Sequence, residues 1–200
     1  MNILYLHGFQ SSSSSNTINY LKNNISNDHV VFSIDLPHQP ELAINLISDT
    51  IKKLKIDIII GTSLGGLYAY NFEMPRICIN PAFQFDMKPG IYKYLNPRIN
   101  NETHFSIDYN DVLYLKKLKE SYKNRLPIDE LHYTSYILIG NNDDVVNFDK
   151  LSTYTNIYDE IIYDDFEHRL TTEIIDKHIF NLIDKLDKVI ETIKNYGISD

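Results

Sequence analysis

The sequence contains one cysteine, no tryptophan and a deficit of basic residues. Cys78 alone excludes an intrachain disulfide and a zinc site built from several cysteines. Lys and Arg number 19 against 27 Asp and Glu, a formal net charge of −8 that disfavours nucleic-acid binding, which normally begins at a basic surface. No apolar run approaches the roughly 18 residues of a membrane span, and the basic region of a signal peptide is missing. We therefore expect a cytoplasmic protein with no nucleic-acid or membrane partner.

Length and patterning indicate the fold class. The 200 residues suffice for one sizeable core. Apolar strands alternate with amphipathic helices, as in βαβ units. We predict a single α/β domain over residues 1–200, with a six-stranded parallel sheet and helices on both faces. The expected strands are 2–6, 29–34, 57–60, 76–80, 135–139 and 160–163. The aromatic-rich stretch at about 83–132 breaks this alternation and predicts a small cap or lid insertion.

Two of the expected helices carry clear apolar stripes. The first follows Pro40, a residue favoured at a helix start. Its predicted buried stripe is Leu42, Leu46/Ile47, Ile51 and Leu54. The second is the last helix of the chain, which Thr171 or Thr172 is expected to cap. Its predicted stripe is Ile175, Ile179, Leu182/Ile183, Leu186, Val189/Ile190 and Ile193.

The stretch Ile58–Tyr70 carries the first chemical motif. A β-branched run ends in Gly-x-Ser-x-Gly, centred on Ser63, and a helical pattern follows at once. A nucleophile elbow requires this strand–turn–helix context, because its serine sits on a sharp turn with the hydroxyl exposed. Gly61 and Gly65 stand where strand and helix crowd each other. The motif predicts that Ser63 is the nucleophile of a serine hydrolase.

Two further residues complete a catalytic set at the ends of predicted strands. Asp143 follows the fifth strand and His168 the sixth, and parallel sheets present their sites at the carboxyl ends of strands. The order Ser, Asp, His is that of α/β-hydrolases. His168 is the expected base, and Asp143 would hold its imidazole tautomer. Asp143 also fits a simple turn former, and Asp144 is the alternative acid.

The loop after the first strand is the candidate oxyanion loop. The backbone N–H groups of Phe9 and Leu64 are the expected donors to a tetrahedral oxyanion. His7 and Gly8 are expected to support this loop, with His7 acting through hydrogen bonds. The other histidines lack the spacing of metal ligands, so we expect no metal.

These segments resemble the small bacterial YqiA-type esterases of the α/β-hydrolase superfamily. The similar segments are Leu4–Ser12, Asp35–Pro37, Gly61–Ala69, Ile79–Ala82 and Asn142–Phe148. The resemblance places the acid on Asp143 and, through Phe166–Leu170, the base on His168. Asp165-Phe166-Glu167 stands where the family has glycines, so this loop must reach the site without the freedom of glycine. The resemblance implies an esterase of short acyl esters that needs no cofactor.

We therefore expect hydrolysis of a small-molecule acyl ester through an acyl-Ser63 intermediate. A thioesterase or a carbon–carbon hydrolase uses the same residues and stays open as an alternative. A hydrolase-like protein that only binds a ligand is the alternative from another class. Either a monomer or a homodimer is compatible with the sequence.

Overall fold

The computed structural model describes residues 1–83, 109–123, 134–149, 151–156 and 158–196. In these residues six parallel strands form one sheet, as predicted, and their order is β2-β1-β3-β4-β5-β6. The strands are β1 (Asn2–Leu6), β2 (Val30–Ser33), β3 (Ile58–Thr62), β4 (Arg76–Ile79), β5 (Ser135–Gly140) and β6 (Asp159–Asp164). The β5 and β6 strands thus occupy one side of the sheet, and β3 lies near its centre.

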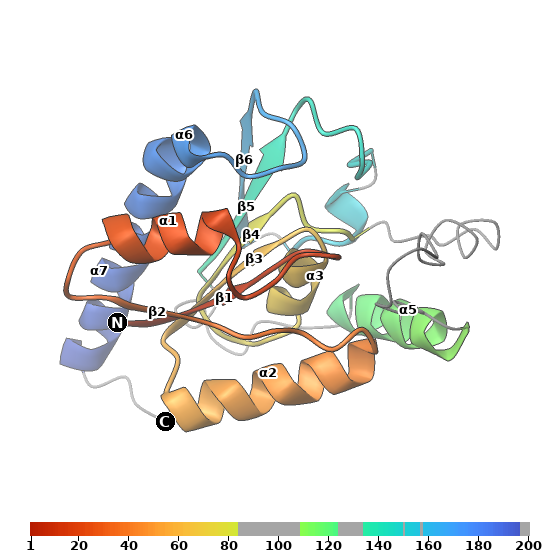
Figure 1. Cartoon of the computed structure of the whole chain (residues 1–200), viewed down its shortest axis with the longest axis horizontal. Helices are drawn as coiled ribbons and strands as arrows, with labels where there is room; N and C mark the ends of the chain where they lie inside the picture. Colours follow the sequence, from red (N-terminus) through yellow and green to blue (C-terminus); the bar gives the residue numbers. More distant parts are fainter. Residues whose placement is uncertain (84–108, 124–133, 150, 157, 197–200) are drawn as a thin grey trace.

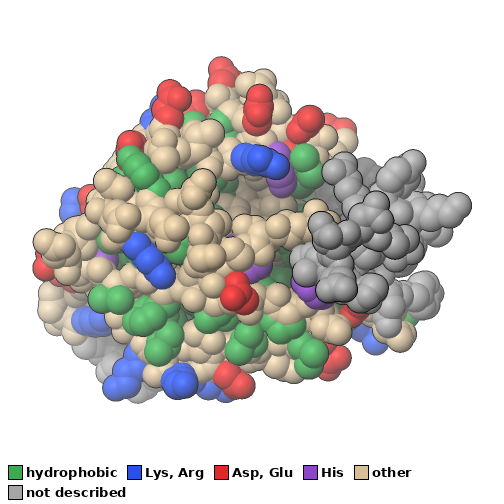
Figure 2. Space-filling model, viewed as in Figure 1, with side chains coloured by type: hydrophobic (Ala, Val, Ile, Leu, Met, Phe, Trp, Pro, Cys, Tyr) green, Lys and Arg blue, Asp and Glu red, His purple; other side chains and the backbone are tan. Residues whose placement is uncertain are grey.

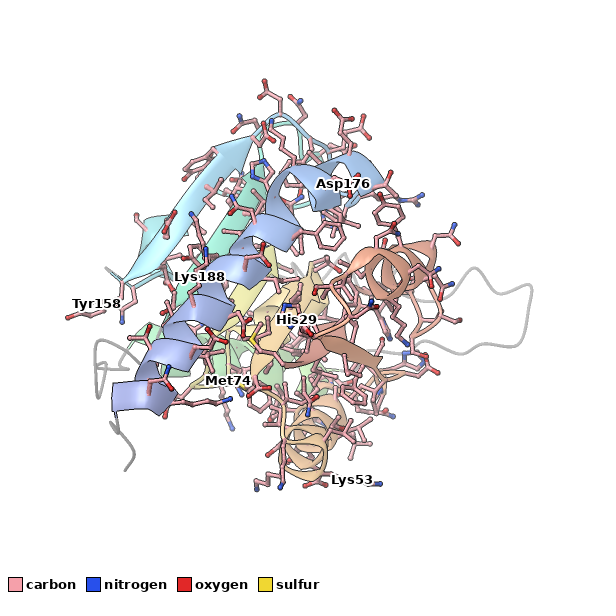
Figure 3. All side chains as sticks on the ribbon, turned by 90° about the vertical axis from the view of Figure 1, so that its left-hand side faces the viewer. His29, Lys53, Met74, Tyr158, Asp176 and Lys188 are labelled. Atoms are coloured by element: carbon pink, nitrogen blue, oxygen red, sulfur yellow. The ribbon has the colours of Figure 1, made fainter. Side chains whose placement is uncertain are left out.

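Helices cover both faces of the sheet (Figure 1). One face carries α1 (Asn16–Asn24), α6 (Thr172–Ile174) and α7 (Phe180–Tyr196), and the other carries α2 (Pro40–Leu54), α3 (Leu64–Ala69) and α5 (Tyr109–Lys123). Successive strand side chains alternate between the faces. Ile3 therefore packs in the core beneath α1 and α7, and Leu4 in the core beneath α2 and α3. Figure 3 shows α7 lying across one face of the sheet, with α1 beside it on the same face.

The α2 helix begins at the proline, as predicted, and buries part of the predicted stripe. Pro40 occupies its first turn, and Lys55, at a left-handed φ of 49°, ends it. Its buried residues are Pro40, Ala43, Ile47 and Thr50. Leu42, predicted to be inside, is 53% exposed, and at the predicted position Leu46/Ile47 the buried residue is Ile47, while Leu46 is 36% exposed. Of the predicted stripe, Ile47 is buried and Ile51 and Leu54 pack against the core, whereas the prediction for Leu42 was wrong. The apolar side chains of α2 spread over more than half of the helix circumference, so periodicity alone does not select the buried line.

A π-helical turn, Ile175–Ile179, joins α6 to α7. Thr171 caps α6, its hydroxyl accepting a hydrogen bond from the Ile174 N–H at 3.4 Å. The buried residues of this segment are Ile174, Ile175, Ile179, Leu182, Ile183, Leu186 and Ile190, so most of the predicted stripe is confirmed. The sequence pattern did not predict the π turn. It presents Lys177 and His178 to the carboxylate of Asp164, at 2.8 and 2.6 Å.

A buried ion pair joins β4 and β6 at the amino end of the sheet. Arg76 lies 3.6 Å from Asp159, and both side chains are almost wholly buried. The Tyr70 hydroxyl donates a hydrogen bond to Asp159 at 2.5 Å. The guanidinium carbon of Arg76 lies 4.6 Å from the centre of the Tyr70 ring. Burial, together with the Asp159 carboxylate, raises the pKa of Tyr70, so this phenol stays a hydrogen-bond donor.

The predicted cap insertion at about 83–132 lies outside the described residues, apart from Phe83 and α5. The α5 helix packs Leu115 and Leu118 into the core that also contains α2. The extent of the insertion stays a prediction. In the described part of the chain, no helix combines the length and the apolar character that crossing a membrane requires.

Candidate active site

Ser63 lies on a sharp turn between β3 and α3, at φ 52° and ψ −117°. A non-glycine residue in this region costs on the order of 1–3 kcal/mol and persists only where its surroundings enforce it. Here the Ser63 N–H donates to the carbonyl of Ile79 at 2.9 Å, and the Ser63 carbonyl accepts from the N–H of Ala82 at 3.1 Å. The end of β4 therefore fixes the strained turn.

The two motif glycines allow α3 to pack directly on the strands. A Cβ on Gly61 would collide with the backbone of Gly65, and one on Gly65 would collide with the carbonyl oxygens of Leu6 and His7. Only glycine permits these approaches. They bring the N-terminus of α3, directly after Ser63, against the loop that follows β1.

Three predicted side chains meet at the carboxyl end of the sheet. The Nε2 atom of His168 lies 3.1 Å from the hydroxyl oxygen of Ser63, and its Nδ1 atom lies 2.8 Å from Oδ2 of Asp143. An ionised carboxylate only accepts, so Nδ1 carries the proton when the ring is neutral. Nε2 is then free to accept the proton of the Ser63 hydroxyl. The structure thus brings together residues from three loops that the sequence separates by up to 105 positions.

Asp143 is held by hydrogen bonds to both of its oxygens. Oδ1 accepts from the N–H groups of Val145 and Val146, at 2.8 and 2.9 Å, while Oδ2 accepts from His168. The Asp143 side chain is 0% exposed, against 20% for that of His168. The neighbouring Asp144 is exposed. The partner of His168 is therefore Asp143.

The β6 loop (residues 165–171) carries His168 without a glycine. Among the described residues, Gln10, Lys55, Ser63 and Asn80 are the non-glycine positions at positive φ. Asp165, Phe166 and Glu167 thus follow ordinary backbone conformations. Phe166, 6% exposed, packs into the core beneath α7 and anchors the loop.

Backbone hydrogen bonds tie the β6 loop to the β5 loop (residues 141–149). The N–H groups of Asn141 and Asn142 donate to the carbonyls of Asp164 and Phe166, at 2.8 and 3.2 Å. At the last residue of β6, hydrogen bonds from Lys177 and then His178 hold the pKa of Asp164 well below its usual range. Asp164 therefore stays ionised and bound to the π turn.

The loop after β1 lies against Ser63. His7, 7% exposed, places Nδ1 2.9 Å from the carbonyl of Gly8, and its Nε2 accepts from the N–H of Leu36 at 3.3 Å. Both ring nitrogens of His7 thus form hydrogen bonds with backbone groups, of Gly8 and Leu36, which fits the supporting role predicted for His7. A Cβ on Gly8 would stand 3.2 Å from that of Ser63. Sequence reasoning therefore identified a loop that adjoins the serine.

Two hollows lie near these loops. The smaller, about 30 Å³, has a lining that includes Phe9, Leu64, Leu36, His38 and Tyr68. Its lining therefore includes Phe9 and Leu64, the two residues whose backbone N–H groups are predicted to bind the oxyanion. The larger, about 500 Å³, is lined by the β5 loop and neighbouring residues of β5 and β6, without Ser63.

The surroundings of the site are acidic. Figure 2 shows acidic side chains gathered along the upper edge of this face, where β5 and β6 end. Asp144, Asp165 and Glu167 are exposed on the two loops that carry Asp143 and His168. In the described ranges, no group of three or more His, Cys, Asp or Glu side chains is placed to hold a metal ion.

Comparisons with known proteins add a family and a fold. The sequence model of an uncharacterised protein family, UPF0227, matches residues 2–187. No curated protein matches the chain. The α/β hydrolase domain-containing protein 10 from mouse is similar at a TM-score of 0.66, with 16% identity over 94% of this chain and 90% of that one.

Two further solved structures are similar. The monoacylglycerol lipase of Paleococcus ferrophilus has a TM-score of 0.64 and 13% identity, over 95% of this chain and 94% of that one. The esterase EaEST from Exiguobacterium antarcticum has a TM-score of 0.58 and 14% identity, over 94% and 92%. At such identities the likeness shows the fold alone, and the predicted α/β-hydrolase fold is confirmed.

Proposed function

The chain belongs to the uncharacterised protein family UPF0227, and from this membership and the geometry around Ser63 we propose that it is a serine hydrolase of small carboxylic esters. The family is that of the YqiA-type esterases which the sequence resembles, so the predicted family is confirmed. The single observation that carries the proposal is the chain of contacts from Ser63 to His168 at 3.1 Å and from His168 to Asp143 at 2.8 Å.

The proposed reaction begins at the Ser63 hydroxyl. His168 takes its proton on Nε2 as the oxygen attacks the ester carbonyl, and Asp143 stabilises the resulting imidazolium. The backbone N–H groups of Phe9 and Leu64 would receive the oxyanion, and one such donor is worth about 3 kcal/mol in the barrier. The intermediate then expels the alcohol, which takes the proton from His168 and leaves an acyl group on Ser63.

Water completes the cycle. His168 removes a proton from a water molecule as its oxygen attacks the acyl-Ser63 carbonyl. Collapse of the second tetrahedral intermediate breaks the bond to Ser63 Oγ, which recovers its proton from His168. The products are a carboxylic acid and the free enzyme. No step requires a cofactor.

The site favours catalysis over simple ligand binding. A protein that only bound a ligand would have no need to hold Ser63 at a strained φ of 52° with His168 in hydrogen-bond range. Removal of Ser63 or His168 is expected to abolish turnover. The conformation of Ser63 and its hydrogen bonds are therefore arguments for an activated nucleophile.

The charge around the site supports uncharged esters as substrates. The acidic side chains around the site and the net charge of −8 repel polyanionic leaving groups. Two of the similar structures are named as a monoacylglycerol lipase and an esterase. These observations favour an oxygen ester over a thioester on a phosphate-bearing carrier.

A fluorophosphonate probe tests the proposal directly. We expect covalent labelling of Ser63, found by peptide mass spectrometry, and loss of the label in Ser63→Ala. Ser14→Ala removes an exposed serine hydroxyl from the N-terminal serine run and should label as the wild type does. A folded wild type that stays unlabelled would refute the proposal. Kinetics on matched oxygen esters and thioesters then separate the two substrate classes.

A further inference from the structure

We propose that Asn80 is a positioning residue, which holds the loop of His168 in register with the loop of Asp143. The proposal rests on the function proposed above and adds a residue to which neither motif nor spacing gave a role. Asn80 directly follows β4, the strand that lies between those of Ser63 and Asp143. Its side chain is buried, at 1% exposure, among the ends of the strands.

The Asn80 amide joins both loops at once. Nδ2 donates to the carbonyl oxygens of Glu167 and His168, at 3.1 and 3.4 Å. Oδ1 accepts from the N–H of Gly140, at 2.7 Å. The orientation of the amide follows from these partners, because an N–H requires an acceptor and carbonyls require a donor. One side chain therefore links the end of β5 to the residue that is the proposed base.

The backbone of Asn80 is adapted to this position. Its φ of 43° lies in the left-handed region, which asparagine and glycine adopt more readily than other residues. Its N–H donates to the carbonyl of Leu138 in β5, at 2.9 Å. The preceding residue, Ile79, accepts the hydrogen bond from Ser63. The same turn of chain thus fixes the nucleophile through its backbone and the base through a side chain.

Asn80 continues a line of hydrogen bonds that the backbone begins. Among the described residues, N–H groups of the β5 loop hold the carbonyls of Asp164 and Phe166. The next two carbonyls, of Glu167 and His168, are held by Asn80. Without that amide, the β6 loop would lose the side-chain hydrogen bonds to Glu167 and His168, and the His168 ring must stay aligned with Ser63. A displacement of about 1 Å can cost about 100-fold in rate.

The test uses two variants of Asn80. Asn80→Gly removes the amide without left-handed strain, and Asn80→Asp keeps an acceptor for Gly140 but replaces the donors with an anion facing two carbonyls. We expect both to lower kcat for a short ester, by about 100-fold in Asn80→Gly, with little change in KM. Asn2→Gly is the matched control, because Asn2 donates to two carbonyls, of Leu54 and Lys55, at the opposite end of the sheet. It should lower the melting temperature while kcat stays near that of the wild type.

A spectroscopic measurement separates this proposal from the proposed function. The His168 Nδ1 proton, bound to Asp143, should give a low-field proton resonance that is lost or broadened in both Asn80 variants and kept in Asn2→Gly. Wild-type kcat and resonance in a folded Asn80 variant would overturn the positioning role. If Asn80→Gly does not fold, Asn80→Asp decides alone. A wild type that does not react with fluorophosphonate would refute the proposed function, while the resonance still reports whether Asn80 sets the His168–Asp143 contact.

Discussion

Asp143 and His168 form a hydrogen bond of 2.8 Å in which the carboxylate, wholly buried, has a fixed orientation. Because Val145 and Val146 occupy the second oxygen, the carboxylate cannot rotate away without losing backbone hydrogen bonds. Asp144, the next residue, is exposed to solvent. We therefore expect substitution of these two neighbouring aspartates to have different effects on kcat.

Asp143→Asn should lower kcat by about 10,000-fold, because an amide facing Nδ1 favours the wrong imidazole tautomer. Asp144→Asn is the matched control and should change kcat only slightly. Initial rates on a chromogenic short-chain ester measure both. A larger loss in Asp144→Asn would transfer the role of the acid to Asp144.

Gly65→Ala should destabilise the fold by about 1–3 kcal/mol, because the new methyl group meets the carbonyl oxygens of Leu6 and His7. Urea denaturation measures the loss. Gly8→Ala offers a contrast: its methyl group would stand 3.2 Å from the Cβ of Ser63 and is opposed chiefly by that side chain. We expect Gly8→Ala to slow fluorophosphonate labelling more than it lowers stability. Equal stability in Gly65→Ala and the wild type would contradict the packing described for α3.

Asp159→Ala should cost about 3–5 kcal/mol of folding stability, since it leaves the buried Arg76 without its carboxylate. Lys194→Ala breaks an exposed ion pair with Asp57 and should cost at most about 1 kcal/mol. Both free energies come from denaturant titration. The Arg76 pair lies at the amino end of the sheet, so activity per folded molecule should be unchanged. A selective loss of activity in folded Asp159→Ala would show coupling to the site.

Cys78 should resist thiol reagents in the native protein. The side chain is 0% exposed, and burial raises its pKa to about 12, which disfavours the reactive thiolate. In the unfolded chain the thiol has a pKa of about 8.5. Its contribution to stability is therefore complete below about pH 8.5 and is lost progressively as the pH rises toward about 12. Mass spectrometry after iodoacetamide treatment at pH 8 should detect modification only in urea, and rapid native modification would contradict this burial.

Local patterns predicted the strands and the three residues, Ser63, Asp143 and His168, that meet at the carboxyl end of the sheet. Strand-end positions depend on short apolar runs and turn residues, and the motif around Ser63 depends on steric demands within a few residues. The chain order then placed Asp143 and His168 at the same edge of the sheet, because parallel strands end together. The His168 loop could be located in this way even though its glycines are replaced.

Contacts between distant segments could not be predicted in the same way. The partners of the Asn80 amide lie 60 to 88 positions away along the chain. Two of its three contacts are to backbone carbonyls, which every residue type carries, so the sequence at those positions does not indicate them. The pairing of Arg76 with Asp159 likewise depends on which strands become neighbours of β5. In α2 the sequence pattern misassigned Leu42, because apolar residues also stand on the outer side of this helix.

The position of β6 has a consequence for the order in which the protein loses activity and unfolds in denaturant. In the described sheet it is an edge strand, paired with β5 alone, and it leads directly into the loop of His168. Opening at a sheet margin requires less free energy than global unfolding. Catalytic inactivation in mild urea should therefore precede the loss of far-ultraviolet circular dichroism, with amide hydrogen exchange quickening first in β6. The central strands would then still hold the turn of Ser63, while His168 has moved out of hydrogen-bond range of the Ser63 hydroxyl.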